Sequence, residues 1–231
     1  MLIIVDAKIP AMAKVALSAM GQLLELATDG IVYPAISGHP DIFFCRAGQE
    51  LVVAPDLPAH YLETLLSHGI KTIFGDSPLG MKYPATAHYN AVVTNKYLIH
   101  HPAITDRAIT DLCINKNVLA VKQGYTRCNL MMVGEKYALT SDPGIGRILE
   151  QAGIETLFVD PRQVRLPGFG NGFFGGCCGI LHDTLYVLAG QESFAQSAEI
   201  EVFAADAGYK THWLTAGVAP FDGGGIFFIE E

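Results

Sequence analysis

The sequence predicts a mixed α/β fold in which five strand–strand–helix–strand units form a closed ring, a β/α-propeller. The first observation is a weak internal repeat: two short apolar strands flank a tight turn, and a helix and a third strand follow. The second is the regular placement of these turns, about 40 to 50 residues apart, at Gly48, Asn95, Gly134 and His182. The third is a lone apolar strand at each end of the chain. Pairing of these two strands would close the ring and leave no open sheet edge.

The two ends of the chain are expected to form one unit together. Residues 2–5 are apolar and predict a strand, and the apolar spacing of residues 11–26 indicates an amphipathic helix. Residues 31–33 predict a further strand, and residues 226–229 predict the strand that would pair beside the first. With the ring closed in this way, residues 1–231 are expected to form a single domain.

The other four units follow in chain order. Strand pairs are predicted at residues 41–53, 90–102, 129–139 and 176–189. Helices are predicted at 58–68, 103–114, 146–152 and from near Glu192, and third strands at 71–74, 118–121, 156–159 and 210–214. Asp142 stands just before the helix at 146–152 and is a candidate N-cap. The same order of elements leaves an ordinary doubly wound α/β sheet open as the alternative.

Composition argues against several classes of protein. The chain has 15 Lys and Arg against 23 Asp and Glu, a net charge of −8, and no basic run, which argues against nucleic-acid binding. Mean hydropathy is +0.30, yet no apolar stretch approaches the roughly 20 residues that a membrane-spanning helix needs. The N-terminus has no secretory signal pattern. We therefore expect a cytoplasmic protein that does not bind membranes and whose five cysteines are free thiols.

Three short motifs resemble those of the pentein superfamily. Residues 90–102, with Asn90, an apolar strand, a turn at Asn95 and a strand ending in His-Pro, look like a repeat of the pentein translation initiation factor six. Residues 129–139 resemble a deiminase strand pair, and Asp222 with its three following glycines resembles the run before the deiminases' last strand. The resemblance implies the five-unit β/α-propeller shared by guanidine-modifying enzymes, such as arginine deiminase, and by a non-enzymatic ribosome anti-association factor.

When the turns of this sequence are aligned with those of the guanidine-modifying enzymes, only some of the enzymes' catalytic residues have a match. Asp41 matches the Asp that holds the guanidinium in those enzymes, but their next acidic residue falls near Thr126 and Arg127. Their general-base His falls on Phe173 or Phe174, and the segment 226–229, where their nucleophilic Cys would follow, contains no Cys. The resemblance therefore implies a channel site that is degenerate or repurposed.

In such a ring the first strand of each unit lines a central channel, so its leading residues indicate the site. By repeat alignment Cys178 stands where Asn90 and Asn129 stand. We predict Cys178 as a candidate nucleophile and His88 as its candidate base. Neighbouring strand residues face opposite sides, so at least one of Cys177 and Cys178 is expected in the core. A purely structural role for His88 stays open.

The candidate ligand-binding residues are further polar or thiol side chains at the same end of the channel: Asp41, Asn90, Arg127, Asn129, Cys177 and Asp222. The carboxylates of Asp41 and Asp222 would hold an amine or guanidinium, and Arg127 would hold a carboxylate or neutralise Asp41. The amides of Asn90 and Asn129 would alternatively link neighbouring units. The predicted ligand is a small polar molecule of the amine, amidine or guanidine type.

No cofactor is predicted. Residues 170–175 match G-x-G-x-x-G but lie apart from the preceding strand and lead into a strand rather than a helix, so the dinucleotide pattern is not met. We expect this segment to be a loop over the channel mouth. His100 and His101 have no Cys or His partner at ligand spacing, so no metal site is predicted.

Three functions follow from these observations. The first is a pentein-fold protein whose altered channel binds a small polar ligand. The second is a thiol-dependent hydrolase or transferase that acts on a small amidine or guanidine through Cys178. The third is a non-enzymatic protein that binds another protein or the ribosome. The sequence does not decide whether the protein is an enzyme.

Overall fold

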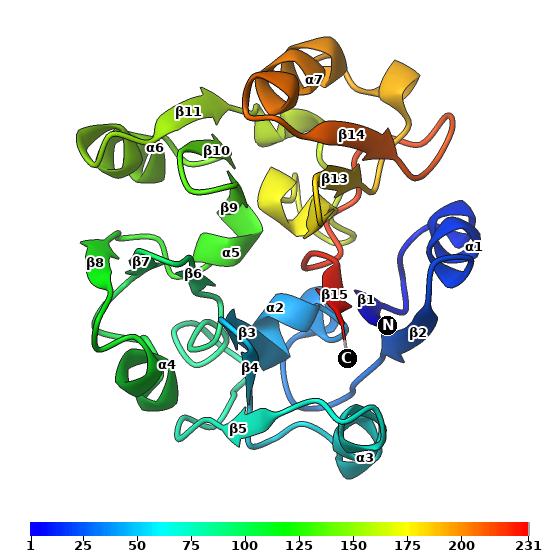
Figure 1. The fold of residues 1–231 in the computed structure, drawn as a ribbon. Coiled ribbons are helices and arrows are strands. Elements are labelled where there is room, and N and C mark those ends of the chain that lie inside the picture. Colours follow the sequence, from blue (N-terminus) through cyan, green and yellow to red (C-terminus); the bar gives the residue numbers. More distant parts are fainter. Residues whose placement is uncertain (231) are drawn as a thin grey trace.

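The computed structural model describes residues 1–230 and contains five three-stranded sheets arranged around a common centre (Figure 1). In each sheet the middle strand runs antiparallel to the inner strand and parallel to the outer strand. A helix on the periphery connects each middle strand to its outer strand. This is the strand–strand–helix–strand unit that the sequence predicts.

Four units follow one another along the chain. The inner strands are β3 (Phe44–Ala47), β6 (Val92–Val93), β9 (Leu130–Val133) and β12 (Cys178–Leu181). The middle strands are β4 (Glu50–Val53), β7 (Tyr97–His100), β10 (Tyr137–Thr140) and β13 (Thr184–Val187). The linking helices are α3 (Ala59–Ser67), α4 (Arg107–Leu112), α6 (Pro143–Gln151) and α7 (Ser197–Asp206). The outer strands are β5 (Thr72–Phe74), β8 (Asn117–Ala120), β11 (Glu155–Phe158) and β14 (Lys210–Trp213).

The fifth unit joins the two ends of the chain. The middle strand β1 (Leu2–Asp6) pairs antiparallel with β15 (Phe227–Ile229), as the sequence predicts, and parallel with β2 (Gln22–Leu26). The linking helix α1 covers only Ala11–Ser18. The prediction of one helix over residues 11–26 is therefore wrong, and so is the strand predicted at 31–33.

The error at β2 has a physical cause. Leu24 and Leu26 face the core on either side of exposed Glu25, a period of two that belongs to a strand. The break falls at Gly21, where a Cβ atom would lie 2.7 Å from the carbonyl oxygen of Met1. Glycine lets the chain turn tightly against the start of β1 and enter β2.

Three of the four predicted turns have a left-handed backbone at the turn residue, and Asn95 does not. Gly48 and Gly134 have φ of 70°, and His182 has φ of 52°, all in the left-handed region that suits two-residue turns. Asp142 caps α6 as predicted, since its Oδ1 accepts hydrogen bonds from the backbone N–H of Gly144 and Ile145 at 2.6 and 2.9 Å. Both features lie where the repeat places them.

The starts of the inner strands differ from the prediction. A one-turn helix precedes three of them: α2 (Pro40–Phe43) before β3, α5 (Thr126–Asn129) before β9 and η3 (Phe174–Cys177) before β12. Successive side chains on a helical turn are about 100° apart. The two-sided alternation expected of a strand therefore does not apply to the residues that lead each unit. Further single turns are η1 (Pro34–Ile36), η2 (Pro161–Gln163) and η4 (Gln191–Ser193).

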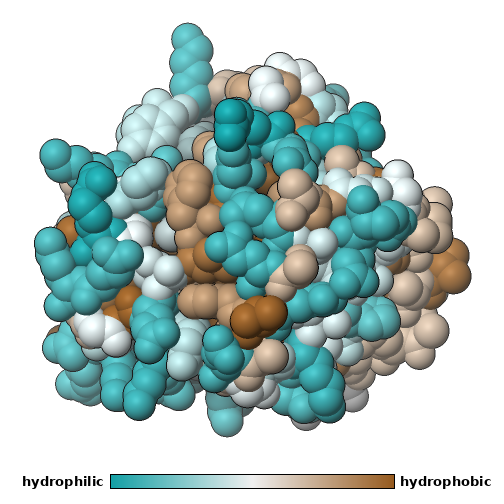
Figure 2. Space-filling model, turned by 90° about the horizontal axis from the view of Figure 1, so that it is seen from above, coloured by the Kyte–Doolittle hydropathy of each residue, from teal (hydrophilic) through white to brown (hydrophobic). Residues whose placement is uncertain are grey.

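The inner strands pack against one another around the centre, with contacts between β3 and β6, β9 and β12, and β12 and β15. Apolar side chains fill the space between neighbouring sheets and beneath the helices. Seen from the edge of the ring, hydrophilic side chains cover most of the surface and hydrophobic ones are scattered among them (Figure 2). None of the helices within residues 1–230 has the length and apolar character needed to cross a membrane.

Candidate functional site

A cavity of about 230 Å³ opens where loops of several units meet. It is lined by Tyr33, Ile36, His39, Gln123, Tyr125, Cys128, Leu166, Phe169, Asn171, Phe173 and Asp222. Of these, Asn171 and Phe173 belong to the segment 170–175, which the sequence predicts to be a loop over the channel mouth. The polar end of the cavity is formed by His39, Cys128 and Asp222, which are all buried.

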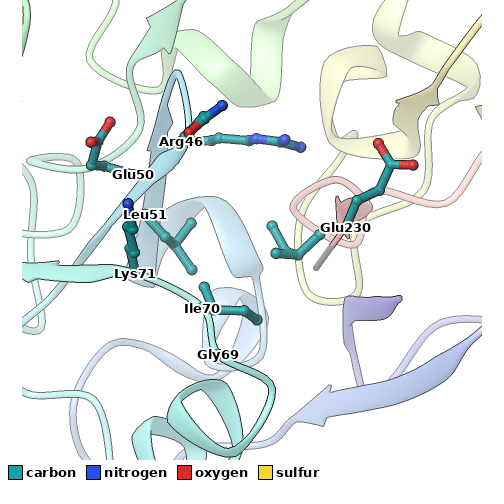
Figure 3. A pocket seen from close by; sticks show the side chains of 9 residues that line it. Arg46, Glu50, Leu51, Gly69, Ile70, Lys71 and Glu230 are labelled. Carbon is teal, nitrogen blue, oxygen red and sulfur yellow. The ribbon is translucent and has the colours of Figure 1, made fainter.

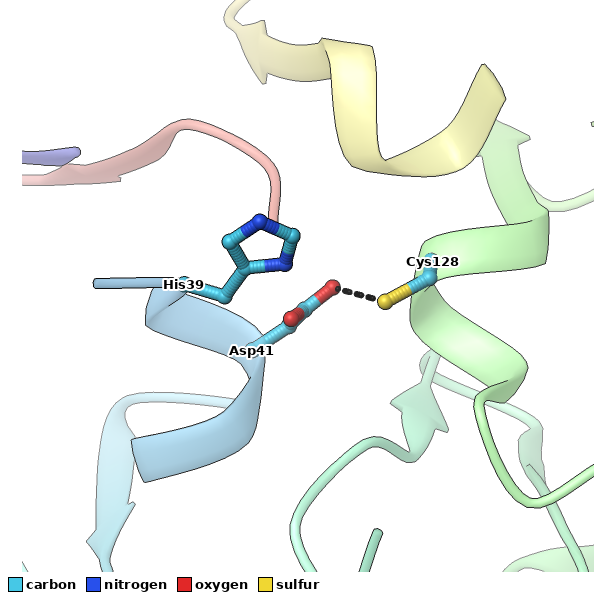
Figure 4. A group of neighbouring side chains, drawn as sticks. All are labelled: His39, Asp41 and Cys128. Atoms are coloured by element: carbon cyan, nitrogen blue, oxygen red, sulfur yellow. Dashed lines mark hydrogen bonds between the residues drawn. The ribbon is translucent and has the colours of Figure 1, made fainter. Parts of the chain in front are cut away.

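Beneath this polar end, two units of the ring meet through a thiol and a carboxylate. His39 precedes α2, Asp41 lies on it, and Cys128 lies on α5, so the side chains approach from facing helical turns (Figure 4). The Sγ of Cys128 donates a hydrogen bond to Oδ2 of Asp41 at 2.9 Å. The other oxygen, Oδ1 of Asp41, has no hydrogen-bond partner within residues 1–230.

Asn90 joins the same two turns from a third unit. Its Nδ2 donates to the carbonyl oxygen of Asp41 at 3.1 Å and to Sγ of Cys128 at 3.3 Å. Its Oδ1 accepts from the backbone N–H of Cys128 at 3.1 Å. A buried amide that uses both its donor and its acceptor groups fixes the positions of its neighbours. Asn90 therefore holds the Asp41–Cys128 pair in place.

His39 lies between two further buried carboxylates. Its Nε2 is 3.8 Å from Oδ2 of Asp6, at the end of β1, and its Nδ1 is 3.9 Å from Oδ1 of Asp222. In the described part of the chain, neither Oδ2 of Asp6 nor Nδ1 of His39 has a hydrogen-bond partner. Asp222 is fixed by the backbone N–H groups of Phe173 and Gly224, at 2.9 and 3.1 Å.

Burial dominates the electrostatics of this group. It raises the pKa of Asp41 to about 6 and that of Asp222 to about 7, in the second case with help from the charge of Asp41. It also raises the pKa of the Cys128 thiol well above its usual value and lowers that of His39 to about 3. Removal from water disfavours every charged form. At neutral pH the imidazole and the thiol are therefore uncharged.

Two glycines permit this close packing. A Cβ atom at position 176 would collide with the carboxylate of Asp222, and one at position 224 would collide with Cβ of His39. Gly224 also has φ of 68°, which side chains rarely tolerate. The backbone at both positions thus passes directly against the polar end of the cavity.

Aromatic side chains form the walls. Tyr33, Tyr125, Phe169 and Phe173 line the cavity, and the rings of Tyr33 and Phe169 lie 5.7 Å apart. The hydroxyl groups of Tyr33 and Tyr125 are 3.4 Å apart, and burial raises the pKa of both phenols. The walls are therefore uncharged and offer aromatic rings and hydroxyl dipoles to a ligand.

The structure brings some of the predicted site residues together. Asp41 and Asn90 lie in one hydrogen-bonded group, and Asp222 lies close by across His39. Arg127 is adjacent, but its guanidinium donates to the carbonyl oxygens of Gly175 and Cys178 at 2.7 and 2.9 Å. It thereby ties α5 to the start of β12, and its charge lowers the pKa values of Asp41 and Asp222.

Other predicted site residues lie elsewhere. Both Cys177 and Cys178 are fully buried, their Sγ atoms face the carbonyl oxygens of Phe173 and Phe174, and burial raises both thiol pKa values. The Nδ1 of His88 is 2.7 Å from the carbonyl oxygen of Ile104, and no hydrogen bond within residues 1–230 joins His88 to Cys178. The structure thus does not pair these two side chains.

Asn129 also makes a local contact. Its Nδ2 donates to the carbonyl oxygen of Tyr125 at 2.8 Å, within its own helical turn. Asn129 and Asn90 occupy equivalent positions of the repeat, but their side-chain amides form hydrogen bonds with different groups in the structure.

The sequence analysis missed His39, Cys128 and Asp6. The repeat itself contained a signal for the first two, because His39 stands two residues before Asp41 as His88 stands two before Asn90. Cys128 likewise stands one residue before Asn129. Strand alternation would have pointed Cys128 away from Asp41, and only the helical turn of α5 brings the two together.

A second cavity, of about 360 Å³, lies between β4, the end of α3 and β15 (Figure 3). Its charged side chains are Arg46 and Lys71 of one sign and Glu50 and Glu230 of the other. None of these four is buried. A cavity whose charged side chains balance one another and remain in contact with solvent offers less to a specific ligand than the cavity above the buried carboxylates.

Several solved structures of the pentein fold are similar to this chain. An amidinotransferase of saxitoxin biosynthesis from Microseira wollei has a TM-score of 0.56 at 12% identity, covering 94% of this chain and 78% of that one. The agmatine deiminase of C. jejuni has a TM-score of 0.53 at 8% identity, covering 84% and 69%. DDAH from Pseudomonas aeruginosa, complexed with citrulline, has a TM-score of 0.50 at 11% identity, covering 88% and 78%.

At these identities the likeness establishes the pentein fold, as the sequence motifs predict. No curated protein matches the sequence. Residues 4–227 match a family described as DUF6873, a family of unknown function. The match spans nearly the whole chain, and the protein therefore belongs to the DUF6873 family.

Proposed function

We propose that the cavity binds a small organic cation, an amine, amidine or guanidinium, against the carboxylate of Asp222. The observation that carries the proposal is a buried carboxylate at the end of an aromatic-walled cavity. A charge removed from water costs free energy unless it is paired. A cationic ligand would supply the missing partner.

The balance of buried charge supports a cation. Asp6, Asp41 and Asp222 are each at most 1% exposed. Arg127 offsets part of this charge, and the Nζ of Lys8, whose side chain is 40% exposed, lies 3.8 Å from Asp6. Because His39 is neutral, it offsets none. Ionisation of all three carboxylates would therefore leave a net negative group that favours a cation over an anion or a neutral molecule.

The walls and size of the cavity narrow the ligand class. A cation over an aromatic ring face gains about 0.5 to 2 kcal/mol, and four aromatic residues are available. The volume of 230 Å³ is below the roughly 300 to 1,000 Å³ of most ligand pockets, which favours a small molecule. The names of two structural neighbours, an amidinotransferase and an agmatine deiminase, support a guanidino or amidino compound.

The test compares methylguanidine with methylurea, which has nearly the same shape but no charge, by ligand-observed NMR and calorimetry. We expect methylguanidine to bind and methylurea not to bind. Asp222→Asn should weaken methylguanidine binding by about tenfold or more, since a charge-assisted contact contributes about 1.5 to 3 kcal/mol. Asp183→Asn, on the exposed surface, is the matched control. Equal binding of the two probes would refute the proposal.

A second candidate is thiol-dependent hydrolysis or transfer on such a compound. The observation that favours it is Cys128, which lines the cavity next to Asp41 and His39, whereas the predicted nucleophile Cys178 is sealed in the core. The test is incubation with methylguanidine and acetamidine, with mass spectrometry for an adduct on Cys128 and an assay for released ammonia. Loss of both signals in Cys128→Ser, but not in Cys178→Ser, would support this function, and their absence in the parent protein would exclude it for these substrates.

A further inference from the structure

Three buried side chains with metal-binding donor atoms converge beneath the cavity. His39, Asp41 and Cys128 each offer one atom, and these atoms all lie within 4.8 Å of one another (Figure 4). They come from positions far apart in the sequence, on the facing turns α2 and α5. We propose that these three side chains bind a divalent transition-metal ion of the zinc type.

The spacing suits such an ion. Zinc binds sulfur at about 2.3 Å and nitrogen or oxygen at about 2.0 to 2.2 Å, so its ligand atoms lie roughly 3.5 Å apart in a tetrahedral site. The Sγ of Cys128 and Oδ2 of Asp41 are 2.9 Å apart. The three donor atoms, all within 4.8 Å of one another, therefore lie near the separations that such an ion needs.

Unused donor atoms point to a missing partner. Oδ1 of Asp41 and Nδ1 of His39 have no hydrogen-bond partner in the described chain, and water does not reach them because the two residues are only 0% and 1% exposed. An unsatisfied buried polar atom costs about 1 to 3 kcal/mol, and here two of them belong to one group of three residues. A bound cation would satisfy both residues at once.

The chemistry of the donors also suits zinc. One thiolate, one imidazole and one carboxylate are ligands that zinc binds in proteins. The thiol of Cys128 donates a hydrogen bond to Oδ2 of Asp41. On metal binding the sulfur–metal bond replaces the S–H bond, and the proton leaves to solvent.

The surroundings resemble a second layer of metal support. Whichever nitrogen of His39 bound the ion, the other would face a carboxylate, either Asp6 or Asp222, at 3.8 to 3.9 Å. Carboxylates in this position orient a ligating imidazole and increase its basicity. Asn90 donates to the sulfur and fixes the backbone of both turns. The three ligands are thus held by residues of several units.

Three protein ligands leave a fourth position on the ion. His39 and Cys128 line the cavity, so this position would open toward it and accept water or a donor atom of a ligand. The site differs from the sequence expectation of no metal, because donors at positions 39, 41 and 128 have no recognisable ligand spacing. The inference does not depend on the proposed cation binding, and a bound zinc ion would weaken cation binding because its positive charge would lie close to Asp222.

The test adds Co²⁺ to the chelator-treated protein and records its absorption spectrum. We expect a near-ultraviolet sulfur-to-cobalt charge-transfer band and visible bands typical of tetrahedral cobalt, both displaced by Zn²⁺. Cys128→Ser should remove the charge-transfer band. Asp41→Asn and His39→Gln should each weaken Co²⁺ binding by more than about 100-fold, and Asn90→Ala by about 10- to 100-fold, the usual effect of an outer-layer change.

The matched control is Cys178→Ser, which removes a buried thiol next to the site but outside the proposed ligand set. It should leave the spectrum unchanged. If Cys128→Ser does not fold, protection of Cys128 from alkylation by Zn²⁺ in the parent protein gives the same information. Co²⁺ binding without a sulfur band, or equal loss in Cys178→Ser, would overturn the metal site.

The metal site and the proposed function fail separately. Methylguanidine binding is measured on the metal-free protein, and Co²⁺ binding is measured without methylguanidine. Methylguanidine binding with no cobalt spectrum refutes only the metal site, and a cobalt spectrum with no methylguanidine binding refutes only the cation proposal.

Discussion

The carboxylate of Asp222 occupies the space that a side chain at position 176 would need, because a Cβ atom there would collide with Oδ1 of Asp222. The two carboxylate oxygens of Asp222 accept hydrogen bonds from the backbone N–H groups of Phe173 and Gly224, and the carboxylate cannot move without breaking these bonds. Gly176 therefore determines where this carboxylate stands, although its own atoms bind no ligand.

Gly176→Ala should displace Asp222 and weaken methylguanidine binding by about tenfold or more, with a loss of about 1 to 3 kcal/mol in the free energy of unfolding from overpacking. Gly170→Ala is the matched control, since a Cβ atom at position 170 meets nothing within 4 Å. Calorimetric titration and urea unfolding of both variants measure the two effects. Unchanged binding in Gly176→Ala would show that the position of Asp222 does not matter to the ligand.

Phe169→Leu should weaken methylguanidine binding about two- to fivefold, since one exposed cation–ring contact is worth about 0.5 to 1 kcal/mol. Phe169 is 54% exposed, so its replacement should barely change the free energy of unfolding. Phe158→Leu, at an exposed position outside the cavity, should change neither quantity. Calorimetry with methylguanidine separates the two variants, and equal affinities would exclude a role for this aromatic wall.

Alkylation of the native protein should modify Cys128 before the other four cysteines. It alone among the cysteines lines the cavity in the described chain, although its raised pKa will keep the reaction slow at neutral pH. Cys177 and Cys178 are fully buried and should react only on unfolding. Iodoacetamide labelling followed by mass spectrometry of each cysteine-containing peptide gives the order, and faster labelling of Cys178 would contradict the geometry.

Protonation of His100 should destabilise the protein as the pH decreases from 7 to 5, whereas the raised pKa values of Asp41 and Asp222 act in the opposite direction. Burial lowers the pKa of His100 to about 4, and the nearby His88 and His101 act in the same direction. In the unfolded chain the imidazole of His100 has a pKa near 6.5 and binds the proton more readily. The contribution of His100 to the free energy of unfolding is therefore fully present above pH 6.5 and is lost as the pH decreases toward 4.

At about 1.4 kcal/mol per pKa unit, this group should contribute a loss of about 2 kcal/mol by pH 5. Urea unfolding of the parent protein and of His100→Gln at several pH values measures the contribution of His100 to the pH dependence of the free energy of unfolding. The variant should be less stable at pH 7, because the imidazole lies within hydrogen-bonding distance of Thr105 and of the carbonyl oxygen of Gly124, but its stability should depend less on pH. An unchanged pH dependence in the variant would show that His100 is not the responsible group.

The repeat order could be read from the sequence because it depends on local chemistry. Left-handed turns at Gly48 and Gly134 and the cap at Asp142 involve neighbouring residues only. The helix predicted over residues 11–26 failed where tertiary packing prevailed. The leucines at positions 23, 24 and 26 suit either a helix or a strand. They lie in the strand β2 because this segment can pair with the free edge of β1.

The site was predictable only in part, for a related reason. Asp41, Asn90 and Asp222 lead their units, so the repeat identifies them. The pairing of Cys128 with Asp41 depends instead on the helical turn of α5, which places a thiol where strand alternation would not. The predicted pair of Cys178 and His88 assumed that every leading residue points to the centre, and the two side chains bond to separate backbone carbonyl groups instead.

The pairing of β1 with β15 joins segments more than 200 positions apart, and the candidate site lies across this junction. Asp6 ends β1 and Asp222 precedes β15, and His39 lies within 4 Å of both carboxylates. Any opening of the junction would pull the two carboxylates apart. A cation bound to Asp222 in the intact site would oppose that opening and slow hydrogen exchange at the amides of both strands. Ligand binding in the cavity could then be followed by the hydrogen-exchange rates of backbone amides where β1 pairs with β15.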